Sequence, residues 1–314
     1  MILSSKIAVF LLTGFLLLAP EKEYRKKAAE ITPVKEFNRR LDLAGWQFSE
    51  IKSSALKQVY EYYEYPAQKK DTPVFLLLHG MNLDGKTFLE LSPLTAAFRL
   101  LALNFPERSD YYQGSMQDCV LLIQDFCRTM NLKEIYLAGV SYGGIAAMSF
   151  TAADTGIKVK ALALLATFTS GALEDEIPRN IIYNTFIKNT EDYKILWMME
   201  KFYHLAGNGK NSKSIGRILK IKHPAFYRQV FASLENLNAG EKLKAVYCPA
   251  VQIHGINDKT VPYKRAQQSL EIKPQMPFYT IARAGHDVVS THGNEIAEIL
   301  LDFCSNLPYS SKKK

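Results

Sequence analysis

Short apolar segments alternate with segments of helical periodicity along most of this 314-residue chain, and this alternation narrows the available folds more than any other feature. Short, continuously apolar runs are typical of strands buried on both faces of a sheet. We predict such strands at PVFLLLHG (73–80), LLALNFP (100–106), EIYLAGV (134–140), VKALALLAT (159–167), PAVQIHG (249–255) and PFYTIAR (277–283). Helices are expected at residues 87–98, 115–130, 143–153, 263–270 and 294–304. This order predicts an α/β fold, with a mostly parallel central sheet flanked by helices.

Two stretches depart from the alternation. Residues 45–66, GWQFSEIKSSALKQVYEYYEYP, contain clustered tyrosines and predict two strands of a hairpin or meander. Residues 168–243 contain no predicted buried strand, only helical stretches rich in aromatic residues. An insertion of this length far exceeds an ordinary connection, so we predict a helical cap at 168–243, above the carboxyl ends of the strands. The core is then expected to comprise residues 26–167 and 244–307.

The N-terminus carries an uncharged apolar run from Ile7 to Ala19, preceded by Lys6. The run suits the core of a signal peptide better than a bilayer span, which needs roughly 20 residues. No clean A-x-A cleavage site follows, and Pro20 is close to any cut, so a retained anchor stays open, as does a buried N-terminal helix. We therefore predict a signal or anchor segment at 1–25 and a protein that is membrane-anchored or exported, with a cytoplasmic protein as the alternative.

Charge and cysteine content exclude some functions. The net charge of +8 arises partly from lysines and arginines near the start and in the basic tail at 308–314. No nucleic-acid-binding motif accompanies it, so we expect no nucleic-acid partner, and solubility or attraction to an anionic surface explains the charge. The cysteines form no C-x-x-C or Cys/His cluster, which argues against a metal site, and we interpret Cys119, Cys127, Cys248 and Cys304 as small core residues.

The segment LAGVSYGGIA contains a G-x-S-x-G pattern from Gly139 to Gly143, between a predicted strand and a predicted helix. At such a sharp turn the serine takes strained backbone angles, and the flanking glycines avoid clashes with neighbouring backbone. Ser141 would then stand exposed at the top of the sheet, in front of a helix N-terminus. The pattern alone is weak evidence, because an ordinary helix N-cap at a tight turn is the alternative.

A serine hydroxyl needs a base to act as a nucleophile at neutral pH. His286 follows the last predicted strand, and Asp258 lies in the loop after the preceding one, so both are expected at the carboxyl edge of the sheet. The order Ser141, Asp258, His286 is that of a strand–turn–helix serine hydrolase. His254 and His79 each precede a glycine at a strand end and are interpreted as residues that hold loops by hydrogen bonds.

Acyl transfer also needs donors for the developing oxyanion. The N–H of Tyr142, directly after the serine, is one candidate. The N–H of Met81, after the turn at Gly80, is the other. Because only backbone groups are used, both side chains remain free to line an acyl pocket.

Together these blocks resemble the α/β-hydrolase superfamily, in the group of esterases, lipases, proline iminopeptidases and C–C bond hydrolases. LLLHGMNLDGKTF, IYLAGVSYGGIAAMSF, CPAVQIHGINDKTVP and ARAGHD match, in order, that family's oxyanion strand, nucleophile elbow, acid loop and histidine loop. The resemblance implies Ser141 as nucleophile, Asp258 as acid, His286 as base, and Met81 and Tyr142 as oxyanion donors, without a cofactor or metal. Two departures are Val140, where the family often has histidine, and NFPERSD at 104–110, which differs from the family's usual loop.

The cap sequence leaves the substrate open. Trp197, Met198, Met199, Phe202 and Tyr203 form either the cap's own core or an apolar pocket for an acyl or aromatic group. Basic residues between Lys210 and Lys222 form either a solvated face or a contact with anionic lipid head groups.

We expect a serine hydrolase that cleaves a small-molecule carboxylic ester through an acyl-enzyme. An acyltransferase, thioesterase or peptidase using the same residues is the alternative, and a non-catalytic ligand-binding protein of this fold is a third hypothesis. The sequence does not determine the natural substrate or the oligomeric state.

Overall fold

A computed structural model of the chain describes residues 19–30, 45–66, 69, 71–81, 83–106, 116–168, 187–205, 224–235 and 237–307. For residues 27–30, 200–205 and 235 it describes the backbone alone. The apolar run up to residue 18, the basic stretch at 210–222 and the tail at 308–314 lie outside the described residues. Within the described ranges, no helix has the length and apolar character needed to cross a bilayer.

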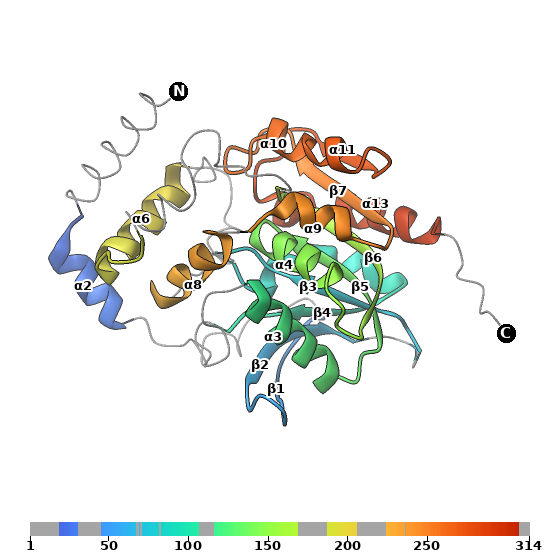
Figure 1. Ribbon diagram of the computed structural model, residues 1–314, viewed down its shortest axis with the longest axis horizontal. Helices are drawn as coiled ribbons and strands as arrows, with labels where there is room; N and C mark the ends of the chain where they lie inside the picture. Colours follow the sequence, from blue (N-terminus) through green and yellow to red (C-terminus); the bar gives the residue numbers. More distant parts are fainter. Residues whose placement is uncertain are drawn as a thin grey trace.

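An eight-stranded sheet forms the centre of the described structure, with strand order β1-β2-β4-β3-β5-β6-β7-β8 (Figure 1). The strands are β1 (Gln47–Lys52), β2 (Val59–Tyr65), β3 (Val74–Leu78), β4 (Arg99–Leu103), β5 (Glu134–Val140), β6 (Lys158–Leu165), β7 (Ala250–Gly255) and β8 (Phe278–Ile281). Of the predicted hairpin or meander, β1 and β2 form an antiparallel hairpin, and β2 also pairs antiparallel with β4. All pairings from β4 to β8 are parallel, as the alternating pattern predicts.

Side chains of the central strands enter two apolar layers, one on each face of the sheet. In β3, Leu76 and Leu78 belong to one layer, whereas Phe75 and Leu77 belong to the other. This division follows from the two-residue period of a strand. It explains why the strand is apolar at every position.

The helices cover both faces (Figure 1). The first layer includes residues of α3 (Met116–Thr129), α4 (Tyr142–Thr151) and α9 (Ala239–Ala245). The second includes residues of η2 (Gly85–Ala96), α12 (Val288–Thr291) and α13 (Gly293–Ser305). The chain is therefore an α/β fold with helices on both faces of a mostly parallel sheet.

Two predicted helices differ from the structure. The helix expected at 87–98 is a 3-10 helix that begins two residues earlier, at Gly85. Asp84 caps it by accepting a hydrogen bond from the Lys86 N–H at 2.9 Å. Pro93 lies inside it, and proline lacks the N–H that a continuous α-helix needs. The helix expected at 263–270 is two short helices, α10 (Tyr263–Gln267) and α11 (Ser269–Ile272).

Between β6 and α9, the described part of the chain includes two helices of the predicted cap, α6 (Asp192–Leu205) and α8 (Pro224–Glu235). The N-terminal helix α2 (Glu21–Glu30) lies beside α6 (Figure 1). Residues 21–25 of the predicted signal or anchor segment thus belong to a packed helix. The predicted cap boundaries stay a prediction.

Candidate active site

Ser141 occupies a sharp turn between β5 and α4, at the carboxyl edge of the sheet. Its backbone has φ 52° and ψ −118°, a conformation that L-residues rarely adopt. The Ser141 N–H donates to the Leu165 carbonyl of β6 at 2.9 Å, which ties the strained residue to the neighbouring strand. The sequence-based prediction of a strained serine between strand and helix is confirmed.

The glycines around Ser141 are required by close backbone approach. A Cβ on Gly139 would collide with the backbone of Gly143, and a Cβ on Gly143 would collide with the carbonyl groups of Leu78 and His79. These collisions are with backbone and not with movable side chains. Only glycine therefore lets α4 begin so close to β3 and β5.

Thr167, which sequence analysis did not single out, supports the turn from β6. Its hydroxyl donates to the Ser141 carbonyl at 2.7 Å, and its side chain fills the space beside Gly144. The Thr167 carbonyl in turn accepts from the buried Gln252 side chain of β7 at 3.1 Å. The turn is thus held by both β6 and β7.

His286 and Asp258 meet Ser141 through a continuous chain of hydrogen bonds. The Ser141 Oγ lies 3.0 Å from His286 Nε2. The other ring nitrogen, Nδ1, lies 2.8 Å from Asp258 Oδ2. Because a carboxylate oxygen accepts, Nδ1 carries the proton and Nε2 is left free to accept from the serine hydroxyl. The structure therefore brings together the three side chains predicted from three separate loops.

The turn after β7 holds Asp258 rigidly. Its Oδ1 accepts the backbone N–H groups of Thr260 at 2.9 Å and Val261 at 2.8 Å. Its side chain is fully buried, whereas that of His286 is 17% exposed. One carboxylate oxygen is thus committed to the loop, and the other faces the imidazole.

The end of β3 lies against Ser141. A Cβ built on Gly80 would lie 3.4 Å from the Ser141 Cβ and from the Val140 carbonyl oxygen, so the residue before Met81 is close to the serine. His79 accepts the Phe105 N–H on Nε2 at 3.0 Å, and its Nδ1 therefore donates to the Gly80 carbonyl at 2.7 Å. The prediction that His79 holds a loop is confirmed.

A sequence profile of the Alpha/beta hydrolase family matches residues 75–299. The chain belongs to this family. The match includes every residue of the Ser141–His286–Asp258 chain, and it establishes a hydrolase of the α/β fold.

The relatives of this hydrolase include esterases. It is 26% identical over 250 residues to the pimeloyl-[acyl-carrier protein] methyl ester esterase of Proteus mirabilis, a match that covers 74% of this chain and 92% of the relative. A thermophilic esterase of Thermogutta terrifontis has a similar structure, with TM-score 0.64 and 17% identity over 82% of this chain and 98% of that one. A solved membrane phospholipase A has TM-score 0.61 and 20% identity, covering 94% of this chain and 97% of that one.

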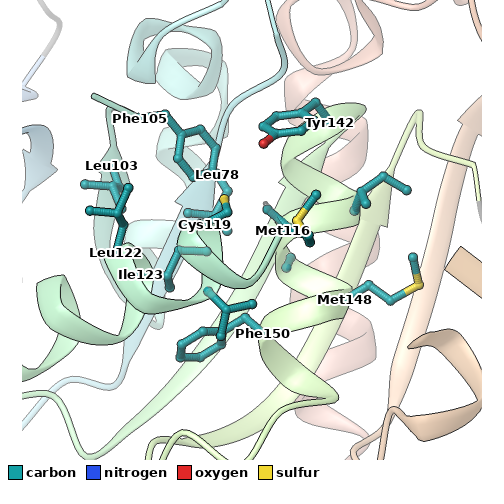
Figure 2. Close-up of a cluster of buried hydrophobic side chains, with 14 of the residues drawn as sticks. Leu78, Leu103, Phe105, Met116, Cys119, Leu122, Ile123, Tyr142, Met148 and Phe150 are labelled. Atoms are coloured by element: carbon teal, nitrogen blue, oxygen red, sulfur yellow. The ribbon is translucent and has the colours of Figure 1, made fainter. Parts of the chain in front are cut away.

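The side chain of Tyr142 in this hydrolase contacts an apolar region formed by residues of α3 and α8. Figure 2 shows it near Phe105 and Cys119, and the rings of Phe105 and Tyr142 are 5.9 Å apart, edge to face. A gap too small for a water molecule is lined here by Phe105, Pro106, Cys119, Leu122, Tyr142 and Phe226. The Tyr142 hydroxyl lies 3.2 Å from the Ser233 Oγ. Since Ser233 donates its own proton to the Val230 carbonyl, Tyr142 is the donor, and it links the turn to α8.

The remaining predicted residues have packing roles where they are described. Trp197 and Met199 are buried in the first apolar layer. The side chains of Phe202 and Tyr203 lie outside the described part. Cys119, Cys127 and Cys248 are buried free thiols and Cys304 is half-buried, and burial raises the pKa of each. Among the described residues, no three His, Cys, Asp or Glu side chains gather as a metal site would require.

Proposed function

We propose that this hydrolase is a cofactor-free serine esterase that cleaves small carboxylic esters with an apolar or aromatic acyl group. The hydrogen-bonded chain from the Ser141 Oγ through His286 to Asp258 carries the proposal. A strained, partly exposed serine whose hydroxyl lies beside an imidazole nitrogen has the arrangement of an activated nucleophile. The esterase relatives support the same reaction class.

In the first half of the reaction, the Ser141 Oγ attacks the ester carbonyl carbon while its proton passes to His286 Nε2. Asp258 stabilises the resulting imidazolium through Nδ1. The carbonyl oxygen becomes negatively charged and is received by the backbone N–H groups of Met81 and Tyr142. His286 then returns the proton to the alkoxide, which leaves as an alcohol, and the acyl group stays on Ser141.

In the second half, water attacks the acyl-enzyme. His286 accepts a proton from the water, and the same two N–H groups stabilise the second oxyanion. Collapse of this intermediate breaks the bond to the Ser141 Oγ, the serine regains its proton from His286, and a carboxylic acid is released.

The side chains around Tyr142 are consistent with an apolar acyl group, because they are aromatic, aliphatic or thiol, with no charged group among the residues described there. The gap between them is too small for a water molecule, so an acyl group would enter it only if these side chains moved apart. The relative that acts on a pimeloyl methyl ester is consistent with an extended aliphatic acyl group.

Labelling with a fluorophosphonate probe tests the nucleophile. Wild type is expected to be labelled and Ser141→Ala is not, although both are folded. Hydrolysis of p-nitrophenyl esters of increasing chain length then measures acyl preference. Labelling of Ser141→Ala, or esterase activity in it close to that of wild type, would contradict the assignment.

The same residues would serve an acyltransferase, thioesterase or peptidase. These alternatives differ in the acceptor or in the leaving group, not in the nucleophile. Adding an alcohol or a thiol to the assay separates a transferase, because a new ester or thioester then replaces part of the free acid. Acyl-thioester and aminoacyl-amide substrates test the other two. A non-catalytic binding protein would turn over none of these substrates.

A membrane location is the second part of the proposal. Helix α2 begins two residues after the apolar run at 7–19, and it is packed on the enzyme. Tyr24 is 3% exposed and belongs to the same apolar layer as Tyr193 of α6. The Arg25 guanidinium lies 4.7 Å from the centre of the Tyr193 ring and forms an ion pair with Glu191 at 2.6 Å.

A peptidase cut between residues 20 and 30 would remove or split this packed helix. Because no clean A-x-A site follows the run and Pro20 is close to any cut before α2, we favour retention of the apolar run as an anchor over its removal. The similarity to a membrane phospholipase A over 94% of the chain is consistent with an anchored enzyme.

The location is tested by fractionating cells that express the full chain with a C-terminal tag. We expect the protein in carbonate-washed membranes, with an intact mass that includes the apolar run. A chain that begins after residue 19, or that is recovered in the soluble fraction, would contradict the anchor.

Tyr24→Ala is expected to lower stability by about 3 kcal/mol, as for other buried aromatic truncations. Lys22→Ala, at an exposed position of the same helix, is the matched control.

A further inference from the structure

His254 is a completely buried histidine at the end of β7, four residues before Asp258. Its Nε2 lies 2.8 Å from the Val261 carbonyl. A carbonyl only accepts, so Nε2 carries a proton and donates. His254 therefore closes the turn that contains Asp258.

The same nitrogen lies 3.3 Å from Asp258 Oδ2. This is the oxygen that accepts from His286 Nδ1 at 2.8 Å. Oδ2 thus has two imidazole nitrogens close to it, whereas Oδ1 accepts two backbone N–H groups of the turn. The hydrogen on this nitrogen is donated to the Val261 carbonyl, so the polar N–H group lies beside the carboxylate oxygen that serves the base without a hydrogen bond to it.

His254 is held in its neutral form. Its Nδ1 is buried and has no hydrogen-bond partner among the described residues, so a second proton would have no acceptor. Burial lowers the pKa of His254, against the opposing influence of Asp258 and the Val261 carbonyl. A neutral N–H beside Oδ2 withdraws some of its negative charge without adding a competing cation.

We propose that His254 is a positioning residue for the reaction, which orients Asp258 Oδ2 toward His286 and limits how strongly that carboxylate favours the imidazolium. The inference rests on the proposed serine hydrolase function. It assigns to His254 a role beyond closing a loop.

The other titratable groups around this pair are few. His286 faces Asp258 from the loop after β8, and Asp287 follows it, with a pKa raised by burial. His292 acts electrostatically on Asp287 from the start of α13. The Tyr263 ring of α10 lies 6.4 Å from the His254 ring. Of these groups, His254 and His286 are the ones with a ring nitrogen within 3.3 Å of Asp258 Oδ2.

His254→Phe tests the role, because it keeps an aromatic ring and removes the N–H. Without that dipole, Oδ2 stabilises the His286 imidazolium more strongly, so the base stays protonated to higher pH. We expect the acidic limb of the pH profile of kcat/KM to move upward by about half a unit and kcat to fall about tenfold, measured with p-nitrophenyl butyrate. His254→Gln, whose amide can place an N–H near the position of Nε2, is expected to restore the limb.

Val261→Ala is the matched control for a structural effect. It loosens the same buried turn without removing the His254 N–H, and it should lower the melting temperature without moving the limb. If His254→Phe destabilises the protein but leaves the limb where it is in wild type, the positioning role is refuted. If wild type lacks fluorophosphonate labelling at Ser141, the proposed function has failed. That outcome is distinct from an unmoved limb in an active enzyme.

Discussion

Replacing Asp258 by asparagine gives the sharpest test of the hydrogen-bonded chain, because the structure predicts which way the amide will face. The oxygen at the Oδ1 position must accept two backbone N–H groups, from Thr260 at 2.9 Å and Val261 at 2.8 Å. The amide nitrogen cannot replace it there without two donor–donor contacts. The NH2 group therefore takes the Oδ2 position and faces His286 Nδ1.

The consequence is a change of tautomer. An NH2 group donates, so Nδ1 of His286 becomes the acceptor and the proton moves to Nε2. The imidazole then presents an N–H to the Ser141 Oγ and can no longer take its proton. Loss of the correct tautomer in a serine triad lowers kcat by about 10⁴-fold, or about 5 kcal/mol of transition-state stabilisation.

The fold should survive this change. The new NH2 group faces the His254 N–H across the 3.3 Å contact, which costs about 1 kcal/mol, while the two backbone hydrogen bonds are kept. The assay is kcat on a p-nitrophenyl ester, with the melting temperature measured in parallel. Asp154→Asn, at an exposed position, is the control. An Asp258→Asn enzyme within about tenfold of wild type would refute the argument that Asp258 sets the tautomer.

Three further predictions concern packing and charge. Gly143→Ala places a Cβ against the Leu78 carbonyl and is expected to cost about 3 kcal/mol or more in urea unfolding, so a loss under 1 kcal/mol would contradict the close approach. Tyr142→Phe removes the donor to Ser233 and should cost about 1 kcal/mol while Ser141 labelling stays within a few-fold of wild type, whereas loss of labelling would show a role beyond packing. Burial raises the pKa of Asp287, so the folded state binds its proton more tightly and stability falls as the pH rises above about 4. Asp287→Asn should therefore raise the melting temperature at pH 7 and leave it unchanged below about pH 4. An equal gain at pH 7 and below pH 4 would contradict burial of the carboxylate as the cause.

Most strands and the site's location could be predicted from the sequence. Buried parallel strands are apolar throughout, so β3, β5, β6 and β7 stand out as short continuous runs. Residues that follow such strands gather at one edge of the sheet, which explains why Ser141, Asp258 and His286 were found from chain order and strand ends.

Other features could not be predicted in this way. The contacts of Thr167 with Ser141 and of His254 with Asp258 depend on the folded geometry and not on a local sequence pattern. The position of His254, four residues before Asp258 across a tight turn, was a usable clue to the second contact. The apolar periodicity of residues 85–96 suits an α-helix as well as a 3-10 helix, so it did not distinguish the two. The 3-10 form of η2 depends on its cap and on Pro93. The packing of α2 on α6 joins residues far apart in the chain, such as Arg25 and Glu191. From composition alone, the start of α2 was assigned to the predicted signal or anchor segment.

By itself, the sequence determined the order of strands and helices along the chain, the glycine-flanked turn and the three side chains that meet there. Each of these was identified from a short local pattern, because every one of the three side chains follows its own predicted strand. Only the tertiary structure decided which oxygen of Asp258 faces the base, which side chains hold the turn, and where the N-terminal helix lies. These depend on contacts between segments that are distant in sequence, whose distances and hydrogen bonds arise only when the sheet and its helices pack together.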